Sequence, residues 1–382
     1  MNPPMPVRPR LLAIILLTLL APHAAAQETP ARARDAYERA IQFEDQGNSA
    51  AALSLLWEAA GLAPRDADVQ NRLGEALERI GALDAAVEAY RRALAERPAF
   101  RKASNNLILA LVKTGKGPEA VTRARALVAE APSDPDRYFT LGLAQSEQDV
   151  DGAIETFRKV LELAPRHTLA RYNLALVLRR ADRLPEALAE LERALAIEPR
   201  PEAHYTMGVI YWHQGDLDRA AAALRAAIAA EPKYADAHDA LGNVLKAKRD
   251  WSGATTSLRR AIALRPGVPA PHYTLGLVLQ LSGDEVGART ELAEAERLRR
   301  TAELEHEALM STSVGIQKME GGDLAGALAQ FQRATAVFDG YAPAHYQMGL
   351  VLQRLGQLDA SRAAFGRAQA LNPSLVPPRG AR

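Results

Sequence analysis

The sequence contains no cysteine among its 382 residues, which excludes disulfides, thiolate-ligated metal sites and a lipid-modified cysteine. It has almost no surplus of basic residues either, since 47 Lys and Arg stand against 46 Asp and Glu. This balance points to neither nucleic acid nor an anionic membrane surface as a partner. Motifs of serine hydrolases, zinc peptidases and phosphate-binding loops are absent, and Gly115-Lys116-Gly117 lacks the rest of such a loop. We therefore expect a protein that is not an enzyme and holds no metal ion or other cofactor.

Long apolar runs are scarce, and the one that occurs lies between Leu11 and Ala21. Arg8 and Arg10 precede it, and three alanines ending at Ala26 follow it. This layout predicts a secretory signal peptide over residues 1–26, cleaved after Ala26, with an uncleaved anchor as the alternative. A membrane-spanning helix needs about 20 apolar residues, so we expect a periplasmic or secreted protein without a membrane span after cleavage. The abundant Ala and the excess of Arg over Lys are typical of a GC-rich, bacterial genome.

Proline recurs along the chain at a nearly constant interval. A glycine or another small residue, and an alanine further along, keep the same period. A constant period within the range of about 20–50 residues indicates a solenoid built from one repeated supersecondary unit. The prolines of the series are Pro64, Pro98, Pro132, Pro165, Pro199, Pro232 and Pro266.

The apolar residues within each period fall at helical spacing in two groups. Leu73, Gly74 and Leu77 form one stripe, and Ala86 and Tyr90 begin a second stripe after a short turn. We therefore predict two antiparallel helices per unit, the second of which ends before the proline because proline lacks an N–H. Glycine costs a helix about 1 kcal/mol relative to alanine, so we expect it to let the two backbones approach closely.

The third unit reverses this distribution of large and small residues. Ile108 stands where other units carry glycine, and Ala124 stands where they carry a large residue such as Phe157. We infer that the two side chains exchange sizes across the helix pair, which conserves the volume between the helices.

These repeated positions resemble the tetratricopeptide repeat, a 34-residue helix–turn–helix unit, on residues such as Leu73-Gly74, Tyr90, Ala93 and Pro98. The resemblance implies an all-α fold, an α-solenoid in which antiparallel helix pairs stack into a right-handed superhelix. It covers nearly the whole chain after residue 26 and leaves no room for a catalytic domain. The ten units begin at Ala33, Ala67, Arg101, Pro135, Thr168, Pro201, Ala235, Pro269, Ala308 and Ala342.

The proline series is interrupted between Pro266 and Pro373, where the chain is densely charged. Because neither Pro nor Gly occurs between Gly287 and Gly315, we expect the second helix of the eighth unit to run long, into the ninth. The two sides of this interruption form either two rigid blocks or one continuous stack. We predict repeats 1–8 over residues 27–300, a charged helical spacer over 301–307, repeats 9–10 over 308–375 and a disordered tail over 376–382.

The last predicted helix carries Phe365, Ala368 and Leu371, and no polar capping repeat follows it. These residues are either partly bare or covered by Leu375 and Val376. A bare apolar end favours contact with a partner or a second copy, which makes the C-terminal end a candidate site of homo-oligomerisation.

Histidine recurs at one position of the first helix, at His204, His238, His272 and His345. Equivalent residues of stacked helices lie about 8–10 Å apart, whereas zinc ligands lie about 2 Å from one ion. We therefore expect these histidines to pack between units, with pH sensing as the alternative.

The position after the histidine is mostly aromatic, and an aliphatic residue follows it four positions later on the same helix face. In tetratricopeptide repeats this face of the first helix lines a concave groove that receives peptides. The resemblance thus implies an aromatic and aliphatic binding stripe, with packing between units as the alternative. The candidate partner-binding residues are Phe139, Tyr172, Leu176, Tyr205, Val209, Trp212, Tyr273, Leu277 and Tyr346.

The family's best-defined ligand mode is a clamp of Lys and Asn for a terminal carboxylate. Lys102 and Asn106 fit part of it, beside Glu75, whereas the preceding unit supplies Tyr37 and Ile41 instead. Because the clamp is incomplete, we do not expect this specificity here.

We expect a non-catalytic protein–protein interaction scaffold, exported to the periplasm or outside, that binds a peptide or protein segment in the concave groove. The alternative is a component of an envelope-assembly complex or of a polysaccharide- or protein-export complex. In that case the last repeats and the charged interruption would matter more than the groove.

Overall fold

The computed structural model describes residues 30–373, 375 and 377. The predicted signal peptide over residues 1–26 and, apart from residue 377, the predicted tail over residues 376–382 lie outside this range. Every regular element in the described part of the chain is an α-helix, as the resemblance implies. None of these helices has the apolar length that crossing a bilayer requires. The chain forms two compact units, residues 1–187 and 188–382.

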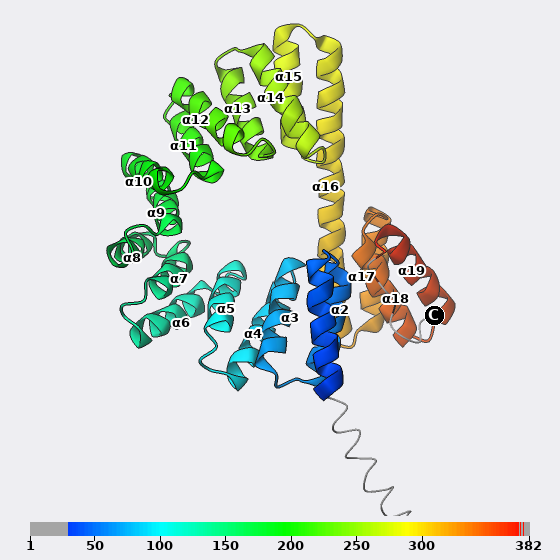
Figure 1. Ribbon diagram of the computed structural model, residues 1–382. Coiled ribbons are helices and arrows are strands. Elements are labelled where there is room, and N and C mark those ends of the chain that lie inside the picture. Colours follow the sequence, from blue (N-terminus) through cyan, green and yellow to red (C-terminus); the bar gives the residue numbers. More distant parts are fainter. Residues whose placement is uncertain (1–29, 374, 376, 378–382) are drawn as a thin grey trace, which may run out of the picture. The chain divides into compact units, whose positions relative to one another are not determined.

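In the first unit, consecutive helices pair and the pairs stack on one another (Figure 1). The helix α10 (Leu184–Ile197) crosses the boundary between the two units. The helices before it are the one over residues 30–45, α2 (Ser49–Leu62), α3 (Ala67–Arg79), α4 (Leu83–Glu96), α5 (Arg101–Lys113), α6 (Gly117–Glu130), α7 (Pro135–Gln145), α8 (Val150–Leu163) and α9 (Thr168–Arg180).

The second unit continues the same alternation of first and second helices. Over residues 30–371 the chain forms nineteen helices, which corresponds to nine to ten repeats. Those of the second unit are α11 (Pro201–His213), α12 (Leu217–Ala230), α13 (Ala235–Ala247), α14 (Trp251–Leu264), α15 (Pro269–Ser282), α16 (Glu285–Glu320), α17 (Leu324–Val337), α18 (Ala342–Arg354) and α19 (Leu358–Leu371).

Local sequence explains where these helices begin and end. The carboxylate of Asp66 accepts hydrogen bonds from the backbone N–H groups of Asp68 and Val69, which caps the start of α3. Most turns inside a pair contain one left-handed residue, such as Gly81 (φ 78°) after α3, and glycine adopts this conformation without strain. Proline follows the end of the second helix as predicted, for example Pro98 after α4.

The repeated glycine lets the two helices of a pair approach closely, which confirms the prediction. A Cβ added at Gly242 would lie 2.5 Å from Leu258 Cγ, and one added at Gly142 would lie 2.7 Å from Phe157 Cε1. Such distances are shorter than any ordinary packing contact, so only glycine fits without rearrangement. In the third repeat, Ile108 and Ala124 are both buried in one apolar cluster, as the exchange of sizes requires.

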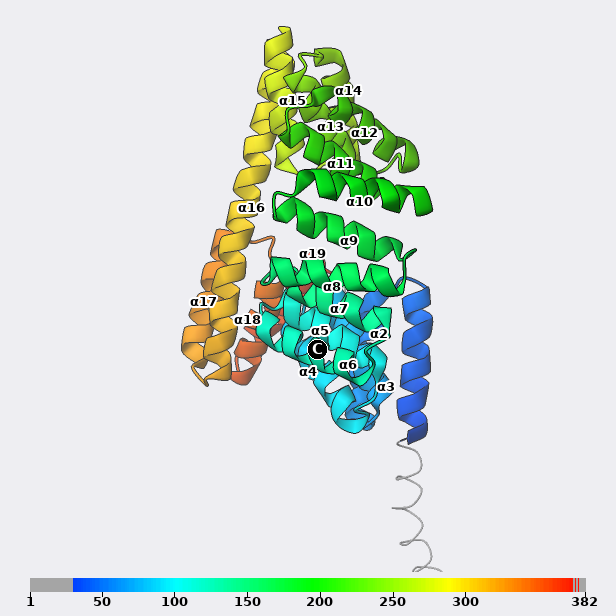
Figure 2. The same cartoon turned by 90° about the vertical axis from the view of Figure 1, so that its left-hand side faces the viewer.

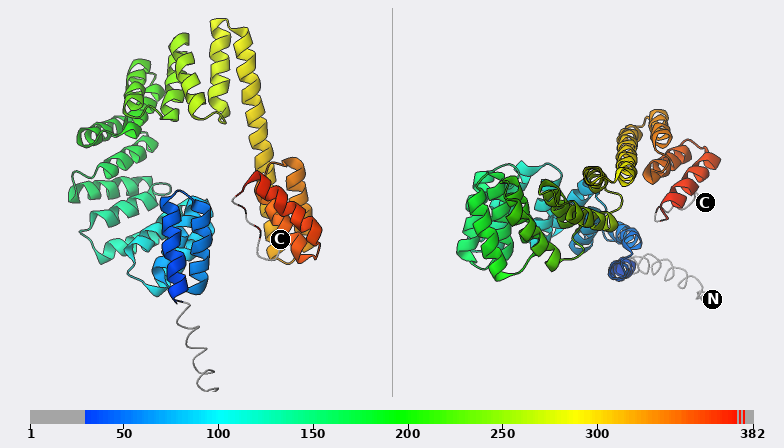
Figure 3. Two further views of the ribbon diagram at one scale, coloured as in Figure 1. Left: turned by 45° about the vertical axis from the view of Figure 1, so that its right-hand side comes forward. Right: turned by 90° about the horizontal axis from the view of Figure 1, so that it is seen from above.

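The long helix predicted across the eighth and ninth repeats is present. Helix α16 has 36 residues and includes residues 301–307. Figures 2 and 3 show it as one unbroken helix, with α15 packed beside its first part and α17 and α18 packed beside its last part. It therefore serves as the second helix of repeat 8 and as the first helix of repeat 9. The division of the repeats at residue 300 stays a prediction.

The core of α19 is covered while its apolar end stays partly exposed, so the choice between a partly bare and a covered end stays a prediction. Phe365 is 2% exposed and Ala368 is fully buried, because both pack inward within the last pair. Leu371 is half-buried, and Leu358 at the start of the helix is exposed. The exposed apolar side chains that favour homo-oligomerisation through the C-terminal end are Leu355 and Leu358, beside the half-buried Leu371.

Candidate functional site

Three of the four recurring histidines bridge the turns between repeats, and His204 does not. His238 Nε2 lies 3.2 Å from the carbonyl oxygen of Pro232, and His272 Nε2 lies 3.2 Å from that of Pro266. His345 makes the same contact to the carbonyl of Asp339 at 3.0 Å. In each case the ring nitrogen can donate to a carbonyl six residues earlier, in the turn that precedes the helix. These histidines thus have a structural role. This agrees with the predicted packing between repeats and adds a hydrogen bond to it.

Other donors take the place of histidine at this position in the first unit. Gln70 donates from Nε2 to the carbonyl of Pro64 at 3.1 Å, and Arg171 donates to that of Pro165 at 2.7 Å. The shared spacing of six residues from the turn carbonyl is therefore the common feature. Within the described residues, no three His, Asp or Glu side chains gather where they could hold a metal ion.

His272 differs from the other histidines because its second ring nitrogen also faces an acceptor. Its Nδ1 lies 2.7 Å from a carboxylate oxygen of Glu291 on α16. A protonated ring can donate to both this carboxylate and the Pro266 carbonyl. Burial lowers the pKa of His204 and of His238, which favours their neutral forms.

In the first unit, the predicted stripe is partly covered. Phe139 on α7 is half-buried and packs against Phe157 and His167, with ring centroids 5.9 and 4.9 Å away. Tyr172 and Leu176 lie one turn apart on α9 and are also half-buried. These three side chains therefore combine packing with partial exposure.

In the second unit, the stripe is carried by α11 and α15. Tyr205, Val209 and Trp212 on α11 are half-buried, and the Tyr205 ring lies 5.3 Å from that of Tyr234. On α15, Tyr273 is 54% exposed and Leu277 is half-buried. Tyr273 is thus the most open of the predicted binding residues on these two helices.

Tyr346 belongs to the last repeat, on α18. It is half-buried, and its ring meets the edge of the Phe365 ring at 5.4 Å. The structure therefore places every predicted residue on a first helix and none of them in the fully buried core. Their role in binding stays a prediction.

A carboxylate interrupts the stripe on α13, the helix that contacts both α11 and α15. Asp239 occupies the position that Tyr205 and Tyr273 occupy on those helices, and it is half-buried. Burial raises its pKa and the nearby Asp236 raises it further, while the charges of Arg265 and Lys246 offset only part of this rise. Within the described residues no Lys or Arg forms an ion pair with Asp239, whose side chain accepts only from Asn243 at 3.2 Å. The sequence analysis did not include Asp239 among the candidate residues, although it stands at the same repeat position as Tyr205 and Tyr273.

In the first unit, the residues of the incomplete clamp bind a carboxylate of the protein itself, that of Glu75. Lys102 Nζ lies 2.7 Å from Glu75 Oε1, and both Asn71 and Asn106 donate to that oxygen, at 2.9 and 3.1 Å. Burial alone would raise the pKa of Glu75, but the hydrogen bonds from Lys102 and Asn71 outweigh it and hold the pKa below its usual range. Glu75 therefore takes the donors that a bound carboxylate would need, which explains physically why this specificity is not expected.

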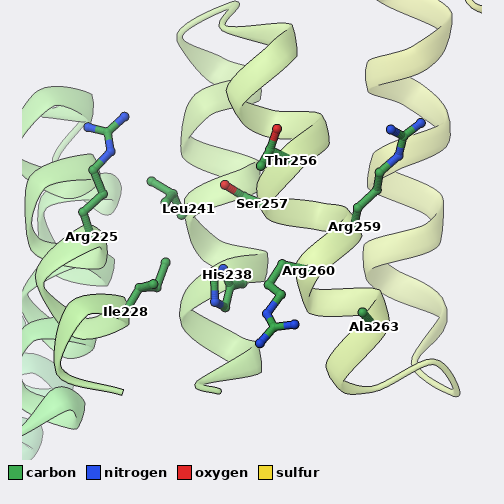
Figure 4. Close-up of a pocket in the computed structure, with 9 residues that line it drawn as sticks. All are labelled: Arg225, Ile228, His238, Leu241, Thr256, Ser257, Arg259, Arg260 and Ala263. Carbon is green, nitrogen blue, oxygen red and sulfur yellow. The ribbon is translucent and has the colours of Figure 1, made fainter. Parts of the chain in front are cut away.

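A hollow of about 520 Å³ on the second unit shares no residue with the predicted stripe. Figure 4 shows Ile228, Leu241 and His238 around it, with Arg225 and Arg259 on separate helices to either side of them. Its walls are mainly apolar and its rim is basic. It is formed by α12, α13 and α14 alone.

Comparisons with known families match most of the chain to one description. Models described as tetratricopeptide repeat match residues 18–100, 80–142, 144–210, 205–269 and 342–375. Together these ranges cover well over half of the sequence.

Solved structures of repeat proteins resemble the chain as well. A tetratricopeptide repeat protein from Parabacteroides merdae is 19% identical, with a TM-score of 0.53, over 65% of this chain and 99% of its own. A thermophilic repeat protein of Thermus thermophilus is 27% identical, with a TM-score of 0.42, over 47% of this chain and 98% of its own. The first of these likenesses supports the stack of paired helices.

Proposed function

This chain belongs to the tetratricopeptide repeat family and is a protein-interaction scaffold, and we propose that its stripe on α11, α13 and α15 binds a segment of another protein. The observation that carries the proposal is the half-buried carboxylate of Asp239 on the helix between those that carry Tyr205 and Tyr273. A partly desolvated carboxylate that forms no ion pair gains more from a directly paired cation than an exposed one does.

The chemistry of this surface favours an extended segment with a Lys or Arg side chain. The charged head would pair with Asp239, and the aromatic rings would accept its stem and attract its charge. A cation over an aromatic ring contributes about 0.5–2 kcal/mol, and the ion pair adds to this. The half-buried aliphatic residues Val209 and Leu277 would bind neighbouring apolar side chains of the same segment.

A displayed library of 12-residue peptides, selected on the purified chain, tests the proposal. We expect the enriched peptides to share a basic residue and to bind Tyr273→Ala and Asp239→Asn at least about fivefold more weakly, which corresponds to roughly 1 kcal/mol. Trp57→Ala is the matched control, because Trp57 is similarly exposed (49%, against 54% for Tyr273) but lies on a second helix, α2. Peptides that bind all three variants with equal affinity would exclude the stripe as the binding surface.

Export is part of the proposal and rests on the sequence of residues 1–26, with its basic start, apolar run and small residues. We expect the protein from a periplasmic or extracellular fraction to begin at Gln27. Intact-mass analysis of fractionated cells measures this, and a cytosolic protein that still begins at Met1 would contradict it.

The second candidate function is a component of an envelope-assembly or export complex. Helix α16 favours it, because 36 continuous residues join the last repeats to the preceding ones through a densely charged segment. Loss of a complex on deletion of residues 301–382, with peptide binding to α11 and α15 intact, would support this candidate over the first.

A further inference from the structure

Because of helix α16, no separate second helix of the preceding repeat packs on the first helix of the ninth repeat. In the other junctions of the second unit, a second helix packs on the following first helix, as α12 packs on α13 and α14 packs on α15. At α16 the second helix of repeat 8 continues directly into the first helix of repeat 9. Ala288 is buried beside α15, and Ala308, further along the same helix, is buried in the following repeats. At about 100° per residue these two contacts lie on nearly opposite faces of α16.

The consequence is an exposed apolar face at the start of repeat 9. The third and seventh residues of a first helix are normally covered: Ala237 and Leu241 of α13 are 0% and 5% exposed. The corresponding residues of repeat 9 are Met310 and Val314, which are 52% and 39% exposed. Leu309 beside them is 44% exposed. We call Leu309, Met310 and Val314 the α16 face. These residues are apolar, as at the other junctions between repeats, but within the described residues no second helix of a preceding repeat covers them.

The other junctions show what kind of helix covers such a face. The covering helix places small or branched residues, mostly apolar, seven positions apart, as α12 does with Ala221 and Ile228 and α14 does with Thr255 and Ile262. Ile228 lines the same hollow as Leu241, the seventh residue of the next helix (Figure 4). In α17, Leu328 and Thr335 occupy these two positions ahead of α18. Seven residues are two helical turns, so both side chains project from one side of the covering helix.

Within residues 30–371, no second helix of this kind has a free face. Two second helices have no first helix after them, namely the first part of α16 and α19. At the same two positions these helices carry Arg289 and Glu296, and Arg362 and Gln369, and all four are exposed. Covering Met310 and Val314 with these polar groups would remove charges from water without a partner for them. The described helices of a second copy therefore cannot complete the junction by continuing the stack.

We propose that the α16 face binds an amphipathic helix of another protein, which takes the place of the missing second helix. The partner helix presents small or branched apolar residues at positions i and i+7 and packs against Met310 and Val314. This surface shares no residue with the stripe on α11, α13 and α15, so the two sites can be occupied independently. An exposed apolar face flanked by charged residues is the usual mark of an interaction site.

A library of displayed amphipathic helices, in which only the outward positions of one face vary, tests the proposal on the full chain. We expect selected helices to carry branched apolar residues seven apart and to bind the double variant Met310→Glu with Val314→Glu at least about tenfold more weakly. The control is Val286→Glu, since Val286 is on the same helix and is 72% exposed. Because all three side chains are exposed, the variants should keep the circular dichroism spectrum and melting temperature of the original chain.

Two further measurements decide between this partner and other occupants of the face. A photo-crosslinker at position 314 should join the selected helix, and light scattering should find a monomer without it. Crosslinks from position 314 to residues of the same chain would overturn the proposal, as would a dimer that Met310→Glu dissociates. Selected helices that bind the double variant as tightly as the original chain would overturn it as well.

Discussion

The exchange of large and small residues across a helix pair predicts a strong coupling between two positions of α13 and α14. Replacing Gly242 by Ile and Leu258 by Ala would recreate in repeat 7 the pair that repeat 3 has as Ile108 and Ala124. Leu258 is fully buried and lies against Gly242, so each single change disturbs a packed contact.

The magnitudes follow from the packing at this contact. Leu258→Ala leaves a cavity, which costs about 2–5 kcal/mol. Gly242→Ile places a Cβ 2.5 Å from Leu258 Cγ, and overpacking of this kind costs about 1–3 kcal/mol or more. In the double variant the Ile side chain occupies the space that Leu258 vacates. We therefore expect the double variant to lose about 2 kcal/mol less than the sum of the single losses.

Hydrogen exchange followed by mass spectrometry measures the effect locally, which suits a repeat protein whose segments open separately. A coupling of about 2 kcal/mol corresponds to a roughly 30-fold slower exchange of α13 and α14 amides than additivity predicts. Gly366→Ile is the control, because nothing lies within 4 Å of a Cβ at this position of α19. Additive losses in the double variant would refute the reasoning about volume exchange.

Three further predictions concern single polar residues. Glu75→Gln should destabilise α3 to α5 at neutral pH, and the difference should disappear as the pH falls below 4.5, because the lowered pKa makes the stabilising effect of Glu75 depend on its ionised form. Unfolding monitored against pH measures this, and a difference that persists in acid would contradict it. Asp239→Asn should stabilise the free protein at neutral pH, because a raised pKa means that the native state disfavours the ionised carboxylate. The gain in stability should vanish as the pH falls toward 3.8. A lower melting temperature of the variant at pH 7 would contradict this prediction. His272→Ala should cost about 1–3 kcal/mol through its contacts with Pro266 and Glu291, more than His204→Ala does, and equal exchange rates for the two variants would argue against the turn bridge.

Much of the fold could be predicted because the repeat period and the helical spacing are both local features of the sequence. Gly74 and Tyr90 mark the two helices of a unit without any knowledge of neighbouring units. The long α16 could also be predicted, since the charged segment before Gly315 contains no residue that would end a helix.

The features that escaped prediction depend on how side chains of different repeats meet. The hydrogen bond across the turn between repeats needs a side-chain donor six residues after the turn carbonyl. His238 stands at this spacing from Pro232. His204 is only five residues after Pro199, which separates it from the other recurring histidines. The spacing was visible in the sequence, but the direction of the ring was not.

Two further features depend on tertiary contacts in the same way. One is the binding of the clamp residues to Glu75, and the other is the position of Asp239 between the aromatic residues of the stripe. Glu75 and Lys102 belong to different helix pairs, and their ion pair requires the two long side chains to extend toward each other. The exposed Met310 could not be anticipated either, because the sequence gives it the apolar character of a covered residue.

The central claim is that the first-helix stripe of the second unit binds a segment of another protein. The most direct measurement places a photo-crosslinker in a selected basic peptide and maps its attachment sites on the full chain by mass spectrometry. The account predicts attachment to α11, α13 and α15 around Asp239, and a loss of this attachment in Asp239→Arg. Attachment confined to the hollow lined by Arg225 and Arg259, or unchanged attachment in Asp239→Arg, would contradict it.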